Sequence, residues 1–157
     1  MPVIHLRTEI NAPIEICFDL ARSIDLHMIS TAHTGEKAIA GRTSGLIERN
    51  ETVTWRAKHL GIWQNLTSVI TDLEFPHYFA DEMVKGAFKR FRHEHRFTYN
   101  GTSTLMLDTF DFESPLGVLG IIANNLFLTK YVERLLAGRN ATIKEYAENG
   151  KGEALIH

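Results

Sequence analysis

The stretch FRHEHRFTYNGTSTLMLDTFDF, Phe91 to Phe112, predicts two β-strands joined by a turn. In its first half, aromatic rings and histidines alternate with charged side chains, which is the pattern of a strand with one buried face. Asn100-Gly101 is a strong hairpin signal, because both residues tolerate a positive φ. The second half therefore returns antiparallel to the first. Similar runs before this stretch extend the prediction to an antiparallel meander.

The alternation also decides which side chains of the first strand share a face. Phe91, His93, His95, Phe97 and Tyr99 fall on one face, and Glu94 falls on the other face among arginines. The two histidines are next neighbours on that face, with Cα atoms about 6.6–6.8 Å apart. A His–Glu–His acid–base triad is excluded if the strand is regular.

Asp108 on the returning strand has two interpretations. In one register it faces the interior, where its carboxylate could hold an imidazole in one tautomer and raise its basicity. In the reversed register it is a surface residue. Met106 and Phe110 share its face while Leu105 and Leu107 do not, and the sequence leaves both registers open.

The remaining elements follow from the same signals. Residues 3–11 predict a first strand, and Asn11-Ala12-Pro13 begins a helix. Asp25 to His33 predicts a second short helix capped by Asp25 and ended by Thr34-Gly35. Further strands follow at 51–59, 62–75 and 78–84. Ser114-Pro115 opens a last helix that ends at Glu148, before Asn149-Gly150. We expect one domain, residues 1–148, and a tail, residues 149–157.

The inward positions predict a pocket instead of a dense core. Trp55, His59, His93, His95, Asp108 and Phe110 would all face inward, and an unpaired buried polar group costs about 1–3 kcal/mol. A mostly apolar interior with a few polar groups is typical of small-molecule pockets. His93 and His95 could share a metal ion, with His59 or Asp108 as third ligand. We predict no metal, because no second clustered ligand motif exists.

The first half of the last helix, Leu116 to Leu128, is apolar nearly all round. It should be covered on several sides or border an apolar ligand. Gly117 and Gly120 weaken the helix by about 1 kcal/mol each relative to alanine. Either they loosen a lid over the pocket, or they allow close packing on the sheet, and both interpretations stay open.

The basic residues of the opposite sheet face could bind a phosphate or an acidic partner. They are Arg56, Lys58, Arg90, Arg92 and Arg96. A solvated sheet face is the favoured interpretation, because Glu94 lies among them and the overall charge is slightly negative.

Composition restricts the class of protein. The chain has 157 residues, 44% of them apolar, and a formal charge of -2, which suits one folded domain and predicts no nucleic-acid partner. Cys17 is the only cysteine, so no internal disulfide is possible. The N-terminus lacks the features of a secretory signal. The longest apolar stretch is too short for stable membrane insertion, and we predict a cytoplasmic location.

This order of elements resembles the START-like domains of the SRPBCC superfamily, in particular bacterial polyketide cyclase/dehydrase and lipid-transport-like ligand-binding proteins. The residues that carry the resemblance are Asn11-Ala12-Pro13-Ile14-Glu15, Gly45-Leu46-Ile47, Phe79-Ala80-Asp81-Glu82-Met83, Gly86-Ala87-Phe88, His93-Glu94-His95-Arg96-Phe97 and Ser114-Pro115-Leu116-Gly117. The resemblance implies an α+β, helix-grip (birch-pollen-allergen-like) fold. A curved seven-stranded antiparallel sheet would wrap around the C-terminal helix, with two short helices after strand 1 and an apolar cavity inside.

Three functions are compatible with these observations. The first is binding or transport of a hydrophobic small molecule, such as a lipid, an isoprenoid or an aromatic or polyketide-like compound, without a cofactor. Its binding residues would be Trp55, His59, Phe91, His93, His95, Phe97, Asp108, Phe110 and Phe127. The second is a cyclase or dehydratase in which His93 or His95 is the acid or base, oriented by Asp108 or His59. The third is a ligand-free interaction subunit, with a homodimer patch at Gly117 to Leu128.

Overall fold

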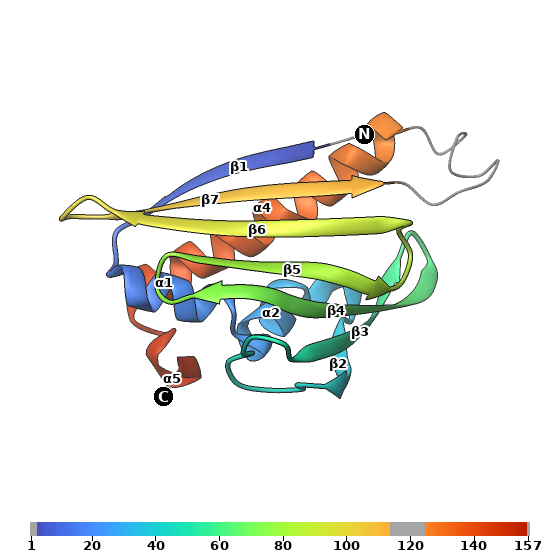
Figure 1. Cartoon of the computed structure of the whole chain (residues 1–157), viewed down its shortest axis with the longest axis horizontal. Helices are drawn as coiled ribbons and strands as arrows, with labels where there is room; N and C mark the ends of the chain where they lie inside the picture. The colour runs from blue at the N-terminus through green and yellow to red at the C-terminus, as the bar shows by residue number, and fades with distance from the viewer. Residues whose placement is uncertain (1–2, 114–124, 157) are drawn as a thin grey trace.

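The sheet of the computed structural model, which describes residues 3–113 and 125–156, has seven antiparallel strands in the order β1-β7-β6-β5-β4-β3-β2 (Figure 1). The strands are β1 (Val3–Ile10), β2 (Lys37–Gly41), β3 (Thr52–His59), β4 (Ile62–Glu74), β5 (Tyr78–Lys85), β6 (Arg90–Tyr99) and β7 (Thr104–Glu113). The predicted curved, seven-stranded antiparallel sheet is confirmed.

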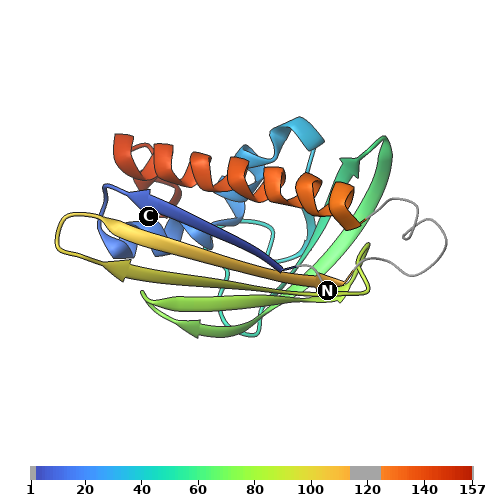
Figure 2. The ribbon, with the colours of Figure 1, turned by 90° about the horizontal axis from the view of Figure 1, so that it is seen from above.

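The helices lie on one side of this sheet. The long helix α4 (Asn125–Asn149) runs across that face, as Figures 1 and 2 show. Its main contacts are with β1 and with the two short helices α1 (Ile14–Ala21) and α2 (Ile24–Ser30). The helix therefore leans on one edge of the sheet and on α1 and α2. The predicted helix start at Ser114-Pro115, both glycines of the lid interpretation and most of the dimer patch lie outside the described residues.

The C-terminal end of α4 matches its sequence signal. The helix ends at Asn149, and Gly150 follows with a φ of 80°. From the sequence, residues 149–157 are expected to form a tail. In the structure, Glu153–Ile156 form the short helix α5, which contacts α1, and Leu155 and Ile156 pack partly buried against the core.

The cap predicted for the second helix was wrong. Ser23 is the N-cap of α2, and its Oγ accepts a hydrogen bond from the Leu26 N–H at 3.1 Å. Asp25 instead accepts from the Gly45 N–H at 2.8 Å, which ties the first turn of α2 to the loop before β3. Serine and aspartate are both favoured N-cap residues, and in this chain Ser23 occupies the N-cap position while Asp25 lies inside the first turn.

The hairpin between β6 and β7 forms as predicted, but only part of the physical reason holds. Gly101 adopts a φ of 95°, whereas Asn100 does not have a positive φ. Asn100 acts through its side chain: Oδ1 accepts from the N–H groups of Thr102 at 3.0 Å and Ser103 at 2.8 Å. This local hydrogen bonding is the other property that favours asparagine in turns.

The inward faces of β6 and β7 settle the register of Asp108. Asp108 is only 2% exposed and shares its buried face with Met106 and Phe110. On β6, the four inward residues Phe91, His93, His95 and Phe97 are all buried. Phe91 belongs to one apolar cluster and Phe97 to another, so the two histidines stand between two parts of the core.

The outer sheet face carries paired charges. Arg92 contacts Glu82 at 2.9 Å and Glu94 at 3.5 Å, and Arg96 lies 3.7 Å from Glu94. Arg56 stacks over the Trp63 ring at 5.0 Å. Glu94 therefore points away from both histidines, as the alternation predicted. The pairing favours the solvated-face interpretation. Among the described residues, no helix is long and apolar enough to cross a membrane.

Gly41 and Gly61 both have a left-handed (positive φ) backbone but differ in the space around them, so they allow a matched test of the β2–β3 packing. A Cβ on Gly41, at φ +74°, would lie 2.3 Å from the carbonyl oxygen of Thr52, whereas a Cβ on Gly61, at φ +82°, would meet nothing within 4 Å. Left-handed backbone costs a residue with a Cβ about 1–2 kcal/mol. We expect Gly61→Ala to lower the free energy of unfolding by about that amount and Gly41→Ala by more, as measured by urea denaturation. Equal losses would contradict the β2–β3 geometry.

Candidate functional site

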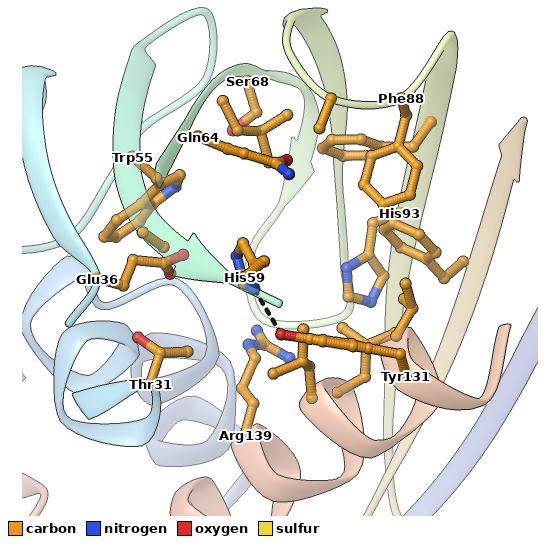
Figure 3. Close-up of a pocket in the computed structure, with 18 of the residues that line it drawn as sticks. Thr31, Glu36, Trp55, His59, Gln64, Ser68, Phe88, His93, Tyr131 and Arg139 are labelled. Atoms are coloured by element: carbon orange, nitrogen blue, oxygen red, sulfur yellow. Dashed lines mark hydrogen bonds between the residues drawn. The ribbon is translucent and has the colours of Figure 1, made fainter. Parts of the chain in front are cut away.

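A cavity of about 290 Å³ lies between the sheet and α4 (Figure 3). Most of its wall is apolar. The sheet and its loops contribute Trp55, Ala57, Leu60, Leu66, Ala87, Phe88, Phe91 and Phe110, and α4 contributes Leu128, Val132, Leu135 and Leu136. The α4 residues recur at spacings of three and four, so one stripe of the helix faces the hollow. The described wall thus combines many apolar side chains with a smaller number of polar ones.

The polar groups on the wall come from several elements. Figure 3 shows Thr31, Glu36 and Trp55 on one side of the cavity and Phe88 and His93 on the other. Further polar side chains on the wall are His27, His59, Gln64, Ser68, Asp81, Tyr131 and Arg139. These groups can orient a ligand, because each offers a hydrogen bond inside an otherwise apolar space.

His59 and Tyr131 join the end of β3 to α4. Nδ1 of His59 lies 2.8 Å from the Tyr131 hydroxyl oxygen. Burial lowers the pKa of His59 below its usual value, and Glu36 opposes that shift. Burial, helped by Glu36, raises the pKa of Tyr131. Both groups are therefore neutral near pH 7, and the pair presents an imidazole and a phenol to the cavity.

Glu36 supplies a negative charge on the same side of the cavity. Burial would raise its pKa, but the hydrogen bond and charge of His27 more than offset that effect and lower it. The His27 ring also packs on Trp55, with ring centroids 4.2 Å apart. Glu36 is thus an ionised carboxylate that is held by His27 against the aromatic wall.

A buried polar cluster adjoins the opposite wall. Asp108 accepts a hydrogen bond from His93 Nε2 at 2.9 Å, and Asp81 accepts one from His95 Nε2 at 3.0 Å. The two imidazole rings lie with centroids 3.8 Å apart, and His95 stacks on Phe79 at 4.0 Å. The register brings the four side chains together, because His93 lies opposite Asp81 on β5 and His95 lies opposite Asp108 on β7. The hydrogen bonds run diagonally between these pairs.

Helix α4 completes this cluster from the other side. Asn140 Nδ2 donates to Asp108 Oδ2 at 2.7 Å. The Arg139 guanidinium lies 3.8 Å from Asp108 and donates to the Ala21 carbonyl at 2.8 Å. Three sheet strands, α4 and the end of α1 therefore meet in one buried cluster around Asp108.

Burial and the contacts within the cluster shift the pKa values of several of its side chains. Burial would raise the pKa of Asp108, but the hydrogen bond from His93 and the nearby His95 ring, whose Nδ1 lies 3.1 Å away, outweigh it and hold the pKa well below the usual range. The pKa of Asp81 is also lowered, because the hydrogen bond from His95 outweighs burial. Burial lowers the pKa of His93 to about 4 despite Asp108. Two ionised carboxylates and a neutral His93 are therefore the state near pH 7.

Five of the nine residues that the sequence predicted for the pocket line the cavity: Trp55, His59, Phe91, His93 and Phe110. His95 and Asp108 are buried beside His93 and do not line it. Phe97 packs with Phe18 and Phe79 in the core. Phe127 is 53% exposed, because it precedes by one position the stripe that begins at Leu128.

Several residues of the site were missed from the sequence. Asp81 could have been found, since it lies two positions after the inward Phe79. Arg139 and Asn140 extend the buried spacing of α4 from Val132 and Leu136 to Ile143. Glu36 had no local signal, because it lies between a 3₁₀ turn and β2 and its orientation depends on His27.

Three side chains of the cluster have the composition of a metal site. One ligating atom each of Asp81, His93 and His95 lies within 4.8 Å of the other two. His59 and Asp108 are the third ligands that the sequence suggests for such a site. The structure instead brings Asp81 to this position.

Comparisons with known proteins agree on the architecture. No protein-family model matches the chain, and no curated protein matches its sequence. Among solved structures, the Zhui aromatase/cyclase from Streptomyces sp. R1128 is similar with a TM-score of 0.74 and 14% identity, over 97% of this chain and 93% of that one. The protein TTHA0849 from Thermus thermophilus gives a TM-score of 0.70 and 17% identity, over 90% and 97%.

A START superfamily protein from Mycobacterium smegmatis is similar with a TM-score of 0.70 and 10% identity, over 92% of this chain and 96% of that one. These identities support a statement about fold alone. The chain has the START-like, helix-grip fold that its sequence predicted.

Asp108→Asn tests the buried cluster against a matched surface change. Removing one charge from a buried, hydrogen-bonded pair typically costs about 3–5 kcal/mol, and we expect a loss of that order in the free energy of unfolding. Asp111 lies on the outer face of the same strand, where it pairs with Arg90 at 3.1 Å. Asp111→Asn should cost less than about 1 kcal/mol. Similar losses for both variants in urea denaturation would refute a special role for the buried carboxylate.

Proposed function

We propose that this chain binds a hydrophobic small molecule in the cavity between the sheet and α4. The main support for this proposal is the cavity itself, because a folded protein interior normally has few voids larger than a water molecule. Its volume of about 290 Å³ is near the lower end of the range for small-molecule pockets, about 300–1,000 Å³. This favours a compact aromatic, isoprenoid or polyketide-like ligand or part of a lipid over a complete phospholipid.

The walls support a ligand with one polar group. Apolar and aromatic side chains would cover most of its surface. The neutral His59–Tyr131 pair can donate or accept a hydrogen bond to a carbonyl or hydroxyl oxygen. Glu36 disfavours an anionic group on its side of the cavity, because two like charges in a low-dielectric space repel strongly. A neutral ligand with a carbonyl or hydroxyl group therefore fits best.

Filling the cavity should abolish binding. Ala57 is buried on the inward face of β3, and Ala87 lines the cavity from the loop after β5. We expect Ala57→Phe and Ala87→Phe each to weaken binding of a neutral fluorescent probe such as a naphthol by tenfold or more. The probe would be titrated into purified protein and followed by fluorescence.

Lys58→Phe is the matched control, because Lys58 is the neighbour of Ala57 on the exposed face of β3. It should leave probe affinity within about twofold. Circular dichroism would verify folding, and Ala87→Phe guards against loss of the fold, since loop positions tolerate larger side chains better than strand cores. The proposal fails if both cavity variants fold and retain the affinity of the unchanged protein.

A cyclase- or dehydratase-type reaction is a second candidate. The observation that favours it is the His59–Tyr131 contact of 2.8 Å on the cavity wall, because a neutral imidazole beside a phenol is a suitable acid–base pair. The similar Zhui protein is described as an aromatase/cyclase. In this reaction His59 would take a proton from the carbon between two carbonyl groups, and Tyr131 would stabilise the enolate oxygen.

Turnover of a linear poly-β-ketone thioester would test this candidate, with products followed by mass spectrometry. His59→Gln should lower the rate by about 10²–10⁴-fold, the usual contribution of one acid–base group, while probe affinity changes little. His5→Gln is the control, because His5 is exposed on β1. Equal rates for the two variants would eliminate His59 as the base and leave the chain as a binder.

A further inference from the structure

We propose that Asp81, His93 and His95 bind a divalent transition-metal ion of the zinc or iron(II) type at the wall of the cavity. Two histidines and one carboxylate form the ligand set of many catalytic zinc and non-haem iron sites. Ligand atoms about 2.0–2.2 Å from one tetrahedral ion lie about 3.5 Å apart. The ligating atoms here are within 4.8 Å of one another, and His95 Nε2 and Asp81 are 3.0 Å apart. Small adjustments would suffice: the widest pair would move closer together, and the closest pair would move slightly apart.

The surroundings of His95 suit a bound cation. Its ring has a carboxylate oxygen beside each nitrogen: Asp81 lies 3.0 Å from Nε2, and Asp108 lies 3.1 Å from Nδ1. Nδ1 is fully buried and has no well-aligned hydrogen bond among the described residues. With an ion held by Nε2 and Asp81, the ring would carry its proton on Nδ1, from which Asp108 can accept a hydrogen bond.

His93 gives an independent indication on the same side. Its Nε2 donates to Asp108, and within the described chain its Nδ1 has no hydrogen-bond partner. The side chain is only 7% exposed. His93 lies on the cavity wall, as Figure 3 shows. His93 is thus a buried side chain with one ring nitrogen free to bind a ligand, and one of its ligating atoms lies within 4.8 Å of those of Asp81 and His95.

Asp108 has the position of a supporting carboxylate. Histidine ligands commonly donate their second ring N–H to a carboxylate, which fixes the ring and the tautomer. One oxygen of Asp108 lies 2.9 Å from His93 Nε2 and 3.1 Å from His95 Nδ1, so it can serve both rings. Asn140 holds its other oxygen at 2.7 Å. Support of a metal site would explain why His93, His95, Asp108 and Asn140 converge in an interior that could otherwise be packed with apolar side chains.

The charges around the site suit a cation. The carboxylates of Asp81 and Asp108 lie directly beside the two histidines, with the Arg139 guanidinium 3.8 Å from Asp108. Carboxylates attract a metal cation strongly where water is excluded. Because Asp81 and His93 also line the cavity, the open coordination positions would face whatever the cavity holds and could bind a carbonyl or hydroxyl oxygen.

Metal binding would be tested on the full chain, stripped with a chelator and then titrated with Zn²⁺ by calorimetry and with Co²⁺ by visible absorption. We expect about one equivalent of each ion, with Co²⁺ bands typical of nitrogen and oxygen ligands at low coordination number. Asp81→Asn keeps a side chain that can accept from His95, and it should weaken binding by at least 100-fold. Asp108→Asn should weaken it by about 10–100-fold, the usual effect of losing a supporting carboxylate.

His5→Gln is the control for adventitious surface binding and should leave both titrations unchanged. Circular dichroism of the Asp81→Asn protein would establish that it folds. The proposal is overturned if the unchanged protein binds no ion stoichiometrically, which would mean that a proton alone balances the cluster. It is also overturned if folded Asp81→Asn binds as tightly as the unchanged protein. Neither result depends on which molecule the cavity binds, since no organic ligand is added.

Discussion

The burial of the Asp108 carboxylate is the constraint on which the rest of this structure depends. An ionised carboxylate in a protein interior is tolerated only when charged and hydrogen-bonding groups surround it. Here the partners are His93, His95, Asn140 and Arg139, and they come from β6 and from α4. The helix cannot slide or rotate on the sheet without uncovering this charge. The position of α4, and therefore the shape of the cavity, is tied to one side chain of β7.

The same constraint connects distant parts of the chain. Arg139, which faces Asp108, also donates to the Ala21 carbonyl at the end of α1. That carbonyl belongs to the last turn of a helix, where backbone oxygens lack partners inside the helix and a cation is favourable. Asp81 brings β5 into the network through His95. A single polar cluster thus fixes the spacing of three strands and two helices, which apolar packing alone specifies less strictly.

The sequence was sufficient for the sheet but not for the cluster. Alternation placed Phe91, His93, His95 and Phe97 on one face, and the hairpin at Asn100-Gly101 fixed their partner strand, because period and turn chemistry are local properties. Asp108 was ambiguous since the apolar residues on its two faces are similar in number. Asp81, Arg139 and Asn140 were not recognised, because their contacts depend on strand register and helix rotation across long sequence separations. Phe127 was expected in the pocket and is instead exposed for the same reason: the cavity-facing stripe of α4 begins one residue later, at Leu128.

The hollow next to the cluster follows from how α4 is held. Its main contacts are with β1, α1 and α2, so it rests on the edge of the sheet and spans the middle strands without closing onto them. A helix that filled this gap with aliphatic side chains would gain dispersion energy. It would also enclose the hydrogen-bonding atoms of His59, His93 and Asp81 that face the cavity, and a polar atom enclosed without a partner costs about 1–3 kcal/mol. The polar groups therefore make complete filling of the cavity by apolar side chains unfavourable. The cavity in turn lets these groups contact an oxygen atom or an ion.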